Sequence, residues 1–255
     1  MAKDLNIAFL DESAPEQQTW EDLINNSYKG SVDYFSIADL PQKGRNVLLV
    51  SGGDGSLNHA INKLMSIEKN DSIEILYFPA GTGNDFSRAV NLYQRSQEEV
   101  ANLLNIGHSA KMRVAKMDEK YFVNMGSFGI FAEVTPEVDP DLKGFFGRWS
   151  YYFKGFEMLT ELRTCEMNFS FEEEELNEKT CLGFFVANSR FSGGGIQITS
   201  EASPYTNSLD LLIVREAPLT DLVSLGIELQ KESPQIEEYN IVHKKVKSFV
   251  EYLFL

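Results

Sequence analysis

The stretch LLVSGGDGSLNHAINKL, residues 48–64, decides the fold, because a short apolar run ends in three glycines grouped around Asp54. Apolar residues then return at helical spacing over residues 57–65. A buried strand that turns through glycines into a helix presents backbone N–H groups at the positive end of the helix dipole. The pattern predicts a strand, an anion-binding turn and a helix.

The acid in this turn allows two interpretations. Gly52, Gly53 and Gly55 permit positive φ and close approach of a bulky anion. Asp54 would repel phosphate unless a divalent cation or a proton transfer lies between them, which indicates Mg²⁺-phosphate chemistry. Alternatively, Asp54 only caps the helix, a frequent role for Asp.

A second turn favours the first interpretation. PAGTGNDFSRAV, residues 79–90, also follows a predicted strand and precedes a helix pattern. Two such turns in successive units would lie side by side at the carboxyl edge of one parallel sheet, where open α/β folds bind ligands. Neither turn has the spacing of a Walker loop or of a dinucleotide fingerprint. A phosphate site here would rely on backbone amides, on a metal, and on Ser56, Asn58, Thr82 and Asn84.

The rest of the chain shows two different hydrophobicity patterns. Short apolar runs alternate with amphipathic ones up to about residue 106, which is typical of an α/β lobe with a parallel, Rossmann-like sheet. Later runs are strand-like and mostly separated by turns, which predicts a mainly antiparallel β-sandwich lobe. Helix patterns cover 148–162 and 219–232, and 171–180 is expected to be a hairpin tip. We therefore expect an α/β nucleotide-binding lobe over 1–108 and a β-rich substrate lobe over 109–255.

Composition limits the partners. A net charge of −15 disfavours nonspecific binding to nucleic acid, because phosphate backbones repel an acidic surface. No apolar run approaches the roughly 20 residues that a membrane span needs. The two cysteines lack metal-binding spacing and favour a reducing compartment. We expect a cytoplasmic chain that is at most peripheral to a membrane; the sequence gives no indication of its oligomeric state.

At this point a family resemblance becomes specific. GGDGSLN at 52–58, followed by PAGTGNDFSR at 79–88, resembles the catalytic domain of diacylglycerol kinases and related lipid kinases. Residues 122–134 and 184–214 resemble later segments of the same family. Phosphofructokinases and NAD kinases share the first turn but lack the GTGNDF run of residues 81–86.

The resemblance implies ATP- and Mg²⁺-dependent transfer of the γ-phosphoryl group to a diacylglycerol-like lipid hydroxyl, with transient contact to a membrane surface. Asp54 is the implied catalytic residue, and Asn84 and Asp85 would brace the second turn. Phe145 and Phe146, flanked by glycines, are candidate lipid contacts. The implied nucleotide-binding residues are Gly52, Gly53, Asp54, Gly55, Ser56, Leu57, Asn58, Gly81, Thr82, Gly83, Asn84 and Asp85.

The sequence also departs from the family pattern. An N-P-x-S-G turn is absent after the first strand, and Asn207-Ser208 replaces an acid-glycine pair, so that Asn207 and Leu209 occupy the family's metal-site segment. No D-G-E turn, which supplies the family's general base, follows Gly195, and a shortened form of a longer chain is one explanation. Two alternatives therefore stay open. One is a weak or inactive member that binds nucleotide, lipid or both, and the other is a kinase for a small soluble substrate. The aromatic stripe over 149–156 is expected to be core rather than a lipid surface.

Overall fold

The computed structural model describes residues 5–10, 17–67, 73–107, 109–129, 164–170, 175–229, 231 and 234–247. The chain forms two compact units, Met1–Met112 and Arg113–Leu255. The lipid-contact candidates Phe145 and Phe146 and the aromatic helix expected over 148–162 lie outside the described residues. In the part of the chain that is described, no helix is long and apolar enough to cross a membrane.

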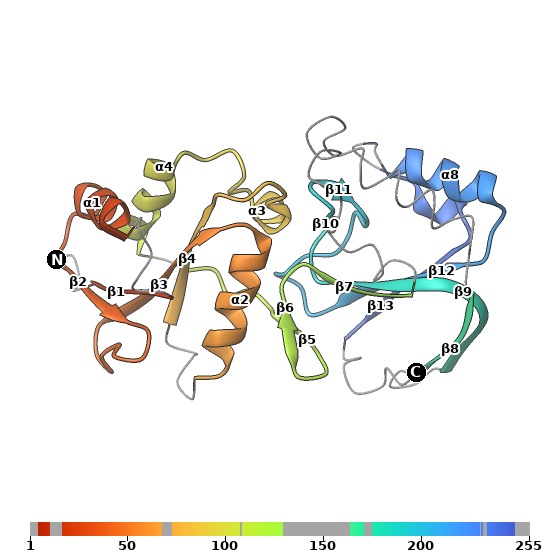
Figure 1. Cartoon of the computed structure of the whole chain (residues 1–255), viewed down its shortest axis with the longest axis horizontal. Coiled ribbons are helices and arrows are strands. Elements are labelled where there is room, and N and C mark those ends of the chain that lie inside the picture. The colour runs from red at the N-terminus through yellow and green to blue at the C-terminus, as the bar shows by residue number, and fades with distance from the viewer. Residues whose placement is uncertain are drawn as a thin grey trace, which may run out of the picture. The chain divides into compact units, whose positions relative to one another are not determined.

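The first unit is built on a four-stranded parallel sheet with the order β2-β1-β3-β4 (Figure 1). This confirms the α/β lobe expected from the alternation of apolar runs. The order reverses between β1 and β3, which makes the carboxyl ends of these strands the switch point of the sheet. The elements are β1 (Leu5–Phe9), α1 (Gln17–Ser27), β2 (Val32–Ser36), β3 (Arg45–Gly52), α2 (Asp54–Met65), β4 (Ile73–Pro79), α3 (Asp85–Ala89), α4 (Gln97–Asn102) and the 3₁₀ helix η2 (Leu103–Ile106).

Helices cover both faces of this sheet. Alternate residues of β1, β3 and β4 pack with Trp20 and Ile24 of α1 and with Val100 of α4 in one hydrophobic cluster. On α2, Leu57, Ala60, Ile61 and Leu64 are buried outside that cluster, and the helix contacts β3. Figure 1 shows α1 and α4 on one side of the strands and α2 on the other. Because both faces are covered, all five residues of β1 are buried, and β3 has a continuous apolar run over 47–50.

Helix boundaries differ from the periodicity at two places. The helix α2 begins at Asp54, three residues before its first apolar position, because Asp, Gly and Ser suit a first turn without adding to an apolar stripe. The sequence over 97–106, whose apolar positions predict one helix, divides into α4 and η2. Ser96 starts α4 with a capping box that includes Glu99.

The second unit contains a mainly antiparallel five-stranded sheet, as expected. Its order is β13-β12-β9-β7, and β8 also pairs with β9. The elements are β5 (Ala115–Met117), β6 (Lys120–Phe122), β7 (Met125–Gly129), β8 (Cys165–Ser170), β9 (Glu175–Ala187), β10 (Phe191–Ser192), β11 (Ile196–Gln197), β12 (Leu209–Arg215), α8 (Leu219–Glu228), the 3₁₀ helix η4 (Ile236–Glu238) and β13 (Ile241–Val246). The expected hairpin tip over 171–180 is wrong in part, because residues 175–180 pair as strand.

Both faces of this sheet are also buried. Leu211 and Ile213 of β12 lie in one hydrophobic cluster, whereas Leu212 lies in a second one together with residues of α8 and η4. The apolar run of β12 follows from this burial on both sides. Cys165 and Cys181 face each other across β8 and β9 as thiols, and each Sγ donates a hydrogen bond to the other's carbonyl oxygen.

Candidate functional site

The register of β3 and β4 brings the two glycine turns of the first unit together. Gly52 is paired with Pro79 at the last position of the ladder, so both chains leave the sheet at the same level. The N–H of Ala80 donates to the carbonyl oxygen of Gly52 at 2.9 Å, and the hydroxyl of Tyr77 donates to the same oxygen at 3.1 Å. The turns therefore begin side by side at the carboxyl edge of the sheet.

The structure requires a glycine at some of these positions but not at all of them. Gly52 has a φ of +145°, and a Cβ there would lie 2.4 Å from Ser56 Oγ. Gly81 lies against Gly53 so closely that its added Cβ would be 2.3 Å from the Gly53 Cα. Nothing within 4 Å would meet a Cβ on Gly55. Backbone contact between the turns therefore requires Gly53 and Gly81, and open space surrounds Gly55.

Asp54 joins the two turns. Its Oδ2 accepts a hydrogen bond from the N–H of Asp85 at 2.9 Å, and its Oδ1 accepts one from the N–H of Phe86, also at 2.9 Å. Asp54 is itself the first residue of α2, whose N-cap is Gly53. The carboxylate thus caps α3 rather than its own helix, an arrangement that neither interpretation of the turn anticipated.

Asn84 holds the second turn closed. Its Oδ1 accepts from the N–H of Gly81 at 2.9 Å, and its Nδ2 donates to the carbonyl oxygen of Gly81 at 2.6 Å. The residue is buried and left-handed, with a φ of +51°, a conformation that Asn tolerates better than most residues. Arg88, which the sequence did not single out, donates from Nε to the carbonyl oxygen of Gly83 and lies over the ring of Tyr93.

The start of α2 is exposed and has a glycine as its N-cap. Its N-cap residue, Gly53, has no side chain that could cap the helix, and Gly55 and Ser56 are exposed there, as is Thr82 on the second turn. The first N–H groups of a helix lack partners within the helix. Leu57, by contrast, is 2% exposed and belongs to the core, so its side chain cannot contact a ligand.

Tyr77, near the end of β4, lies close to two carboxylates. Burial raises the pKa of Tyr77, and the nearby carboxylates of Asp54 and Asp85 raise it further, so this phenol stays protonated at neutral pH. Asn58 carries a buried Oδ1 that accepts no hydrogen bond from any described residue. An acceptor in that position suits a donor supplied by a ligand or by water.

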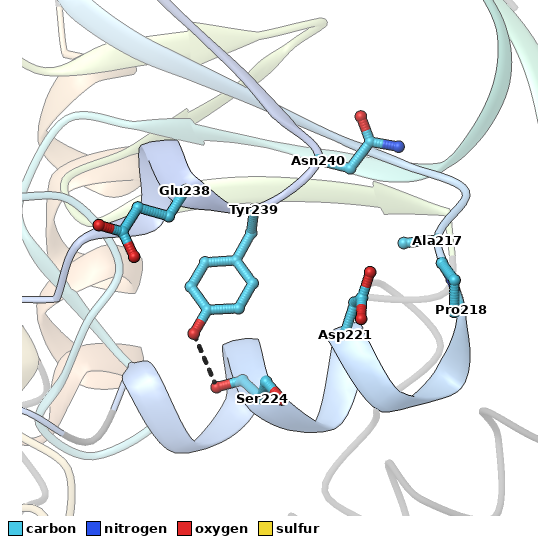
Figure 2. Close-up of a pocket in the computed structure, with 7 residues that line it drawn as sticks. All are labelled: Ala217, Pro218, Asp221, Ser224, Glu238, Tyr239 and Asn240. Atoms are coloured by element: carbon cyan, nitrogen blue, oxygen red, sulfur yellow. Dashed lines mark hydrogen bonds between the residues drawn. The ribbon is translucent and has the colours of Figure 1, made fainter.

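The second unit has a cavity of about 570 Å³ between α8 and the segment from η4 to β13 (Figure 2). Its lining residues are Ala217, Pro218, Asp221, Ser224, Glu238, Tyr239 and Asn240. The Tyr239 hydroxyl donates to the carbonyl oxygen of Ser224 at 3.4 Å. With two carboxylates and no cation in its lining, this cavity does not suit a phosphate group.

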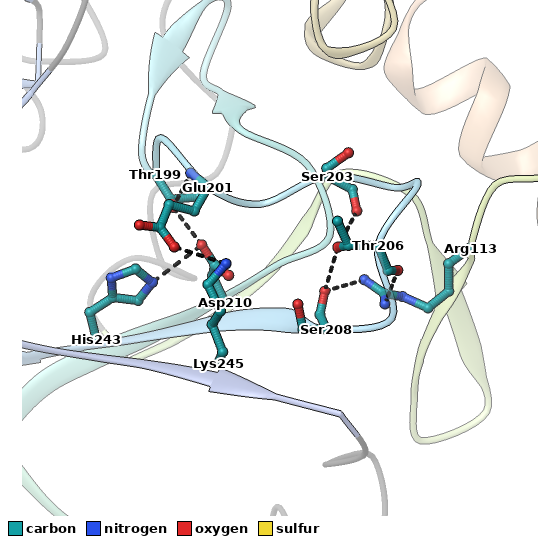
Figure 3. Close-up of polar contacts among 9 residues, drawn as sticks. All are labelled: Arg113, Thr199, Glu201, Ser203, Thr206, Ser208, Asp210, His243 and Lys245. Carbon is teal, nitrogen blue, oxygen red and sulfur yellow. Dashed lines mark hydrogen bonds and ion pairs between the residues drawn. The ribbon is translucent and has the colours of Figure 1, made fainter.

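A buried polar cluster lies near the start of β12 (Figure 3). The Oδ2 of Asp210 accepts from Thr199 Oγ1 at 2.6 Å and lies 3.2 Å from His243 Nε2. Lys245 and Glu201 form an ion pair at 2.8 Å. Burial raises the pKa of Asp210, but the hydrogen bonds from His243 and Thr199 and the charges of His243 and Lys245 outweigh it and lower the pKa.

Comparison with known proteins identifies the family. Residues 14–117 match the diacylglycerol kinase catalytic domain, and residues 124–232 match the YegS C-terminal NAD kinase beta sandwich-like domain. The chain thus contains a diacylglycerol kinase catalytic domain. A diacylglycerol kinase of Staphylococcus carnosus is 30% identical over 207 residues, which are 81% of this chain and 66% of that protein.

Further relatives agree with this assignment. A diacylglycerol kinase of Staphylococcus aureus strain JH9 is 27% identical over 206 residues, which are 80% of this chain and 63% of that protein. The chain thus spans just under two thirds of the length of these relatives. The crystal structure of a diacylglycerol kinase from Bacillus anthracis shares the fold, with a TM-score of 0.68, 19% identity and coverage of 96% of this chain and 84% of that chain.

Proposed function

We propose that this chain binds ATP at the two glycine turns of the first unit and transfers the γ-phosphoryl group to the hydroxyl of a lipid alcohol. The observation that carries the proposal is the exposed, glycine-capped start of α2 beside a second turn that leaves the sheet at the same level. N–H groups in a first helical turn bind phosphate because they lack helical partners and lie at the positive end of the dipole.

The contacts divide the implied nucleotide-binding residues into two groups. Those with exposed atoms, Gly55, Ser56 and Thr82, would contact the phosphates, together with backbone atoms of their neighbours. The buried Asn58 Oδ1 would accept a hydrogen bond from the nucleotide or from a bound water. Asn84 and Asp54 would act by position, since they hold the second turn against the first.

Phosphoryl transfer needs positioned groups and neutralised charge more than covalent work by the protein. Mg²⁺ would arrive with the nucleotide phosphates and neutralise them. The described residues contain no group of three His, Cys, Asp or Glu side chains that could hold a metal alone, so we assign Mg²⁺ no separate protein site. Asp54 would add negative charge close to the bound Mg²⁺.

The names of the relatives support a diacylglycerol-like substrate. A lipid substrate implies transient contact with a membrane surface, so we propose a cytoplasmic chain that is peripheral to the membrane. Phe145 and Phe146 remain the proposed lipid contacts.

The nucleotide site is tested by substitutions at Gly55. A Cβ at Gly55 would meet no atom within 4 Å, and Gly55→Glu favours the helix start, because an acidic residue suits the first turn. It would nevertheless repel phosphate, so we expect the affinity for ATP measured by calorimetry to fall by at least about tenfold, the effect of ~1.4 kcal/mol. Gly55→Ala controls for loss of the glycine. Lys63→Gln, exposed in the last turn of α2, controls for the change in net charge.

Transfer is tested separately with γ-labelled Mg-ATP and a panel of lipid alcohols in mixed micelles. We expect label in a diacylglycerol-like lipid and its loss in Gly55→Glu. ATP binding without label in any lipid would reject the kinase proposal and leave a nucleotide-binding protein. Label in water-soluble sugars or nucleosides would reject the lipid substrate.

A further inference from the structure

One side chain holds the segment 203–208 of the second unit (Figure 3). The guanidinium of Arg113 donates from Nη1 to the carbonyl oxygen of Thr206 and from Nη2 to the carbonyl oxygen of Ser208. The backbone N–H of Arg113 donates to the carbonyl oxygen of Pro204 at 2.7 Å. Three carbonyl oxygens of one short segment therefore accept hydrogen bonds from a single residue.

A buried amide fixes the arginine in place. Asn188 is fully buried, and its Oδ1 accepts from Arg113 Nε at 3.3 Å and from Nη2 at 3.1 Å. Its Nδ2 donates to the carbonyl oxygens of Arg113 at 3.0 Å and of Val123 at 2.9 Å. The planar guanidinium can use several donors in a fixed fork, which a lysine cannot reproduce.

This is the segment in which the family resemblance implies a metal. The residues present suit a divalent cation poorly, since Asn207 supplies an exposed amide in place of a carboxylate and the Leu209 side chain belongs to the core. The carbonyl oxygens of Thr206 and Ser208, which would be natural ligands, already accept from a positive group. A divalent cation needs about six oxygen ligands and would be repelled by that charge.

The remaining charge is also balanced without a metal. Asp210 is 1% exposed. Burial lowers the pKa of Arg113, whereas the negative charge of Asp210 raises it, so the two charges stabilise each other. The Oδ2 of Asp210 is occupied by Thr199 and His243. Its Oδ1 is buried and accepts no hydrogen bond from any residue that the structure describes, so a cation could still use this oxygen.

We infer that the guanidinium of Arg113 takes the place of a bound divalent cation in holding the segment 203–208, and that this segment of the chain needs no metal. The inference concerns the second unit alone. It does not rest on nucleotide binding or on lipid phosphorylation.

The test measures melting of the whole chain without nucleotide. For the wild type we expect the same melting temperature in EDTA as with millimolar Mg²⁺ or Ca²⁺, and no saturable heat when either ion is titrated in. Arg113→Lys keeps the charge but loses the fork, and we expect the melting temperature to fall by roughly 4–8 °C, because carbonyl oxygens lose their donors. For Arg113→Met we expect a larger fall in the melting temperature, because the charge is lost as well. Arg190→Met, at a half-buried position of the same unit, is the control for the loss of an arginine.

Two results would overturn the inference. One is a saturable Mg²⁺ or Ca²⁺ site in the wild type that disappears in Asp210→Asn, which would place a metal at the open Oδ1. The other is an Arg113→Lys protein that melts with the wild type. Kinase activity enters neither measurement, so an inactive protein would count against the proposed function and leave this inference standing.

Discussion

Replacing Asp54 by Asn tests whether the residue braces the two turns or acts mainly in the chemistry. The carboxylate accepts the N–H groups of Asp85 and Phe86, both at 2.9 Å. Asn keeps one acceptor oxygen but turns an NH₂ group toward the other N–H, so one charge-assisted bond is lost and a donor faces a donor. A hydrogen bond to a charged group is worth ~1.5–3 kcal/mol, and an unsatisfied partner adds to the cost.

We therefore expect Asp54→Asn to destabilise the first unit by about 2–4 kcal/mol. For a unit of this size the melting temperature would fall by about 8–16 °C. The local readout is hydrogen exchange, in which the amides of Asp85 and Phe86 should lose protection by at least about tenfold. Asp33→Asn makes the same chemical change at an exposed position of β2 and should alter neither measurement.

The reasoning is refuted if Asp54→Asn melts with the wild type and both amides stay protected. Loss of phosphate transfer in such a protein would instead assign Asp54 directly to catalysis. A destabilised variant that binds ATP weakly at low temperature would support the bracing role.

Two further predictions concern the glycine contact and the buried acid. Gly81→Ala places a Cβ 2.3 Å from the Gly53 Cα, so we expect urea unfolding of the first unit to lose ~1–3 kcal/mol, and an unchanged midpoint would contradict the contact. The pKa of Asp210 is lowered in the folded chain, so its contribution to stability is complete above its unfolded pKa of about 4 and is lost as the pH falls through the lower folded value. The melting temperature of the second unit should therefore be constant above about pH 5 and fall at lower pH. Asp210→Asn should weaken this fall. If the variant shows the same fall as the wild type, Asp210 is not its cause.

The periodicity of apolar residues was sufficient to predict most strands and helices of the first unit. Strands buried on both faces read as short apolar runs, and glycines mark the points where β3 and β4 end. The start of α2 was missed because a first turn of Asp, Gly and Ser has no apolar stripe. The strand at 175–180 was missed because pairing with a neighbour, rather than composition, determines it.

The polar contacts of the candidate site depended on tertiary structure. The bonds from Asp54 join residues 31 and 32 positions apart, and those from Arg113 to the 203–208 segment reach more than 90 positions along the chain. No local pattern carries such a pairing. The one sequence signal was indirect: Asn207-Ser208 departs from the acid-glycine pair of the family's metal-site segment, but this departure does not point to Arg113.

The bond between Asp54 and the start of α3 also has a consequence for biosynthesis. Its partners follow β4, so the first turn gains its brace only after β4 has paired beside β3 and Phe86 has left the ribosome. Domains generally fold as units during translation, with the N-terminal one first. A nascent chain that ends before Phe86 would carry the complete GGDGS motif and still lack the bond that joins the two turns.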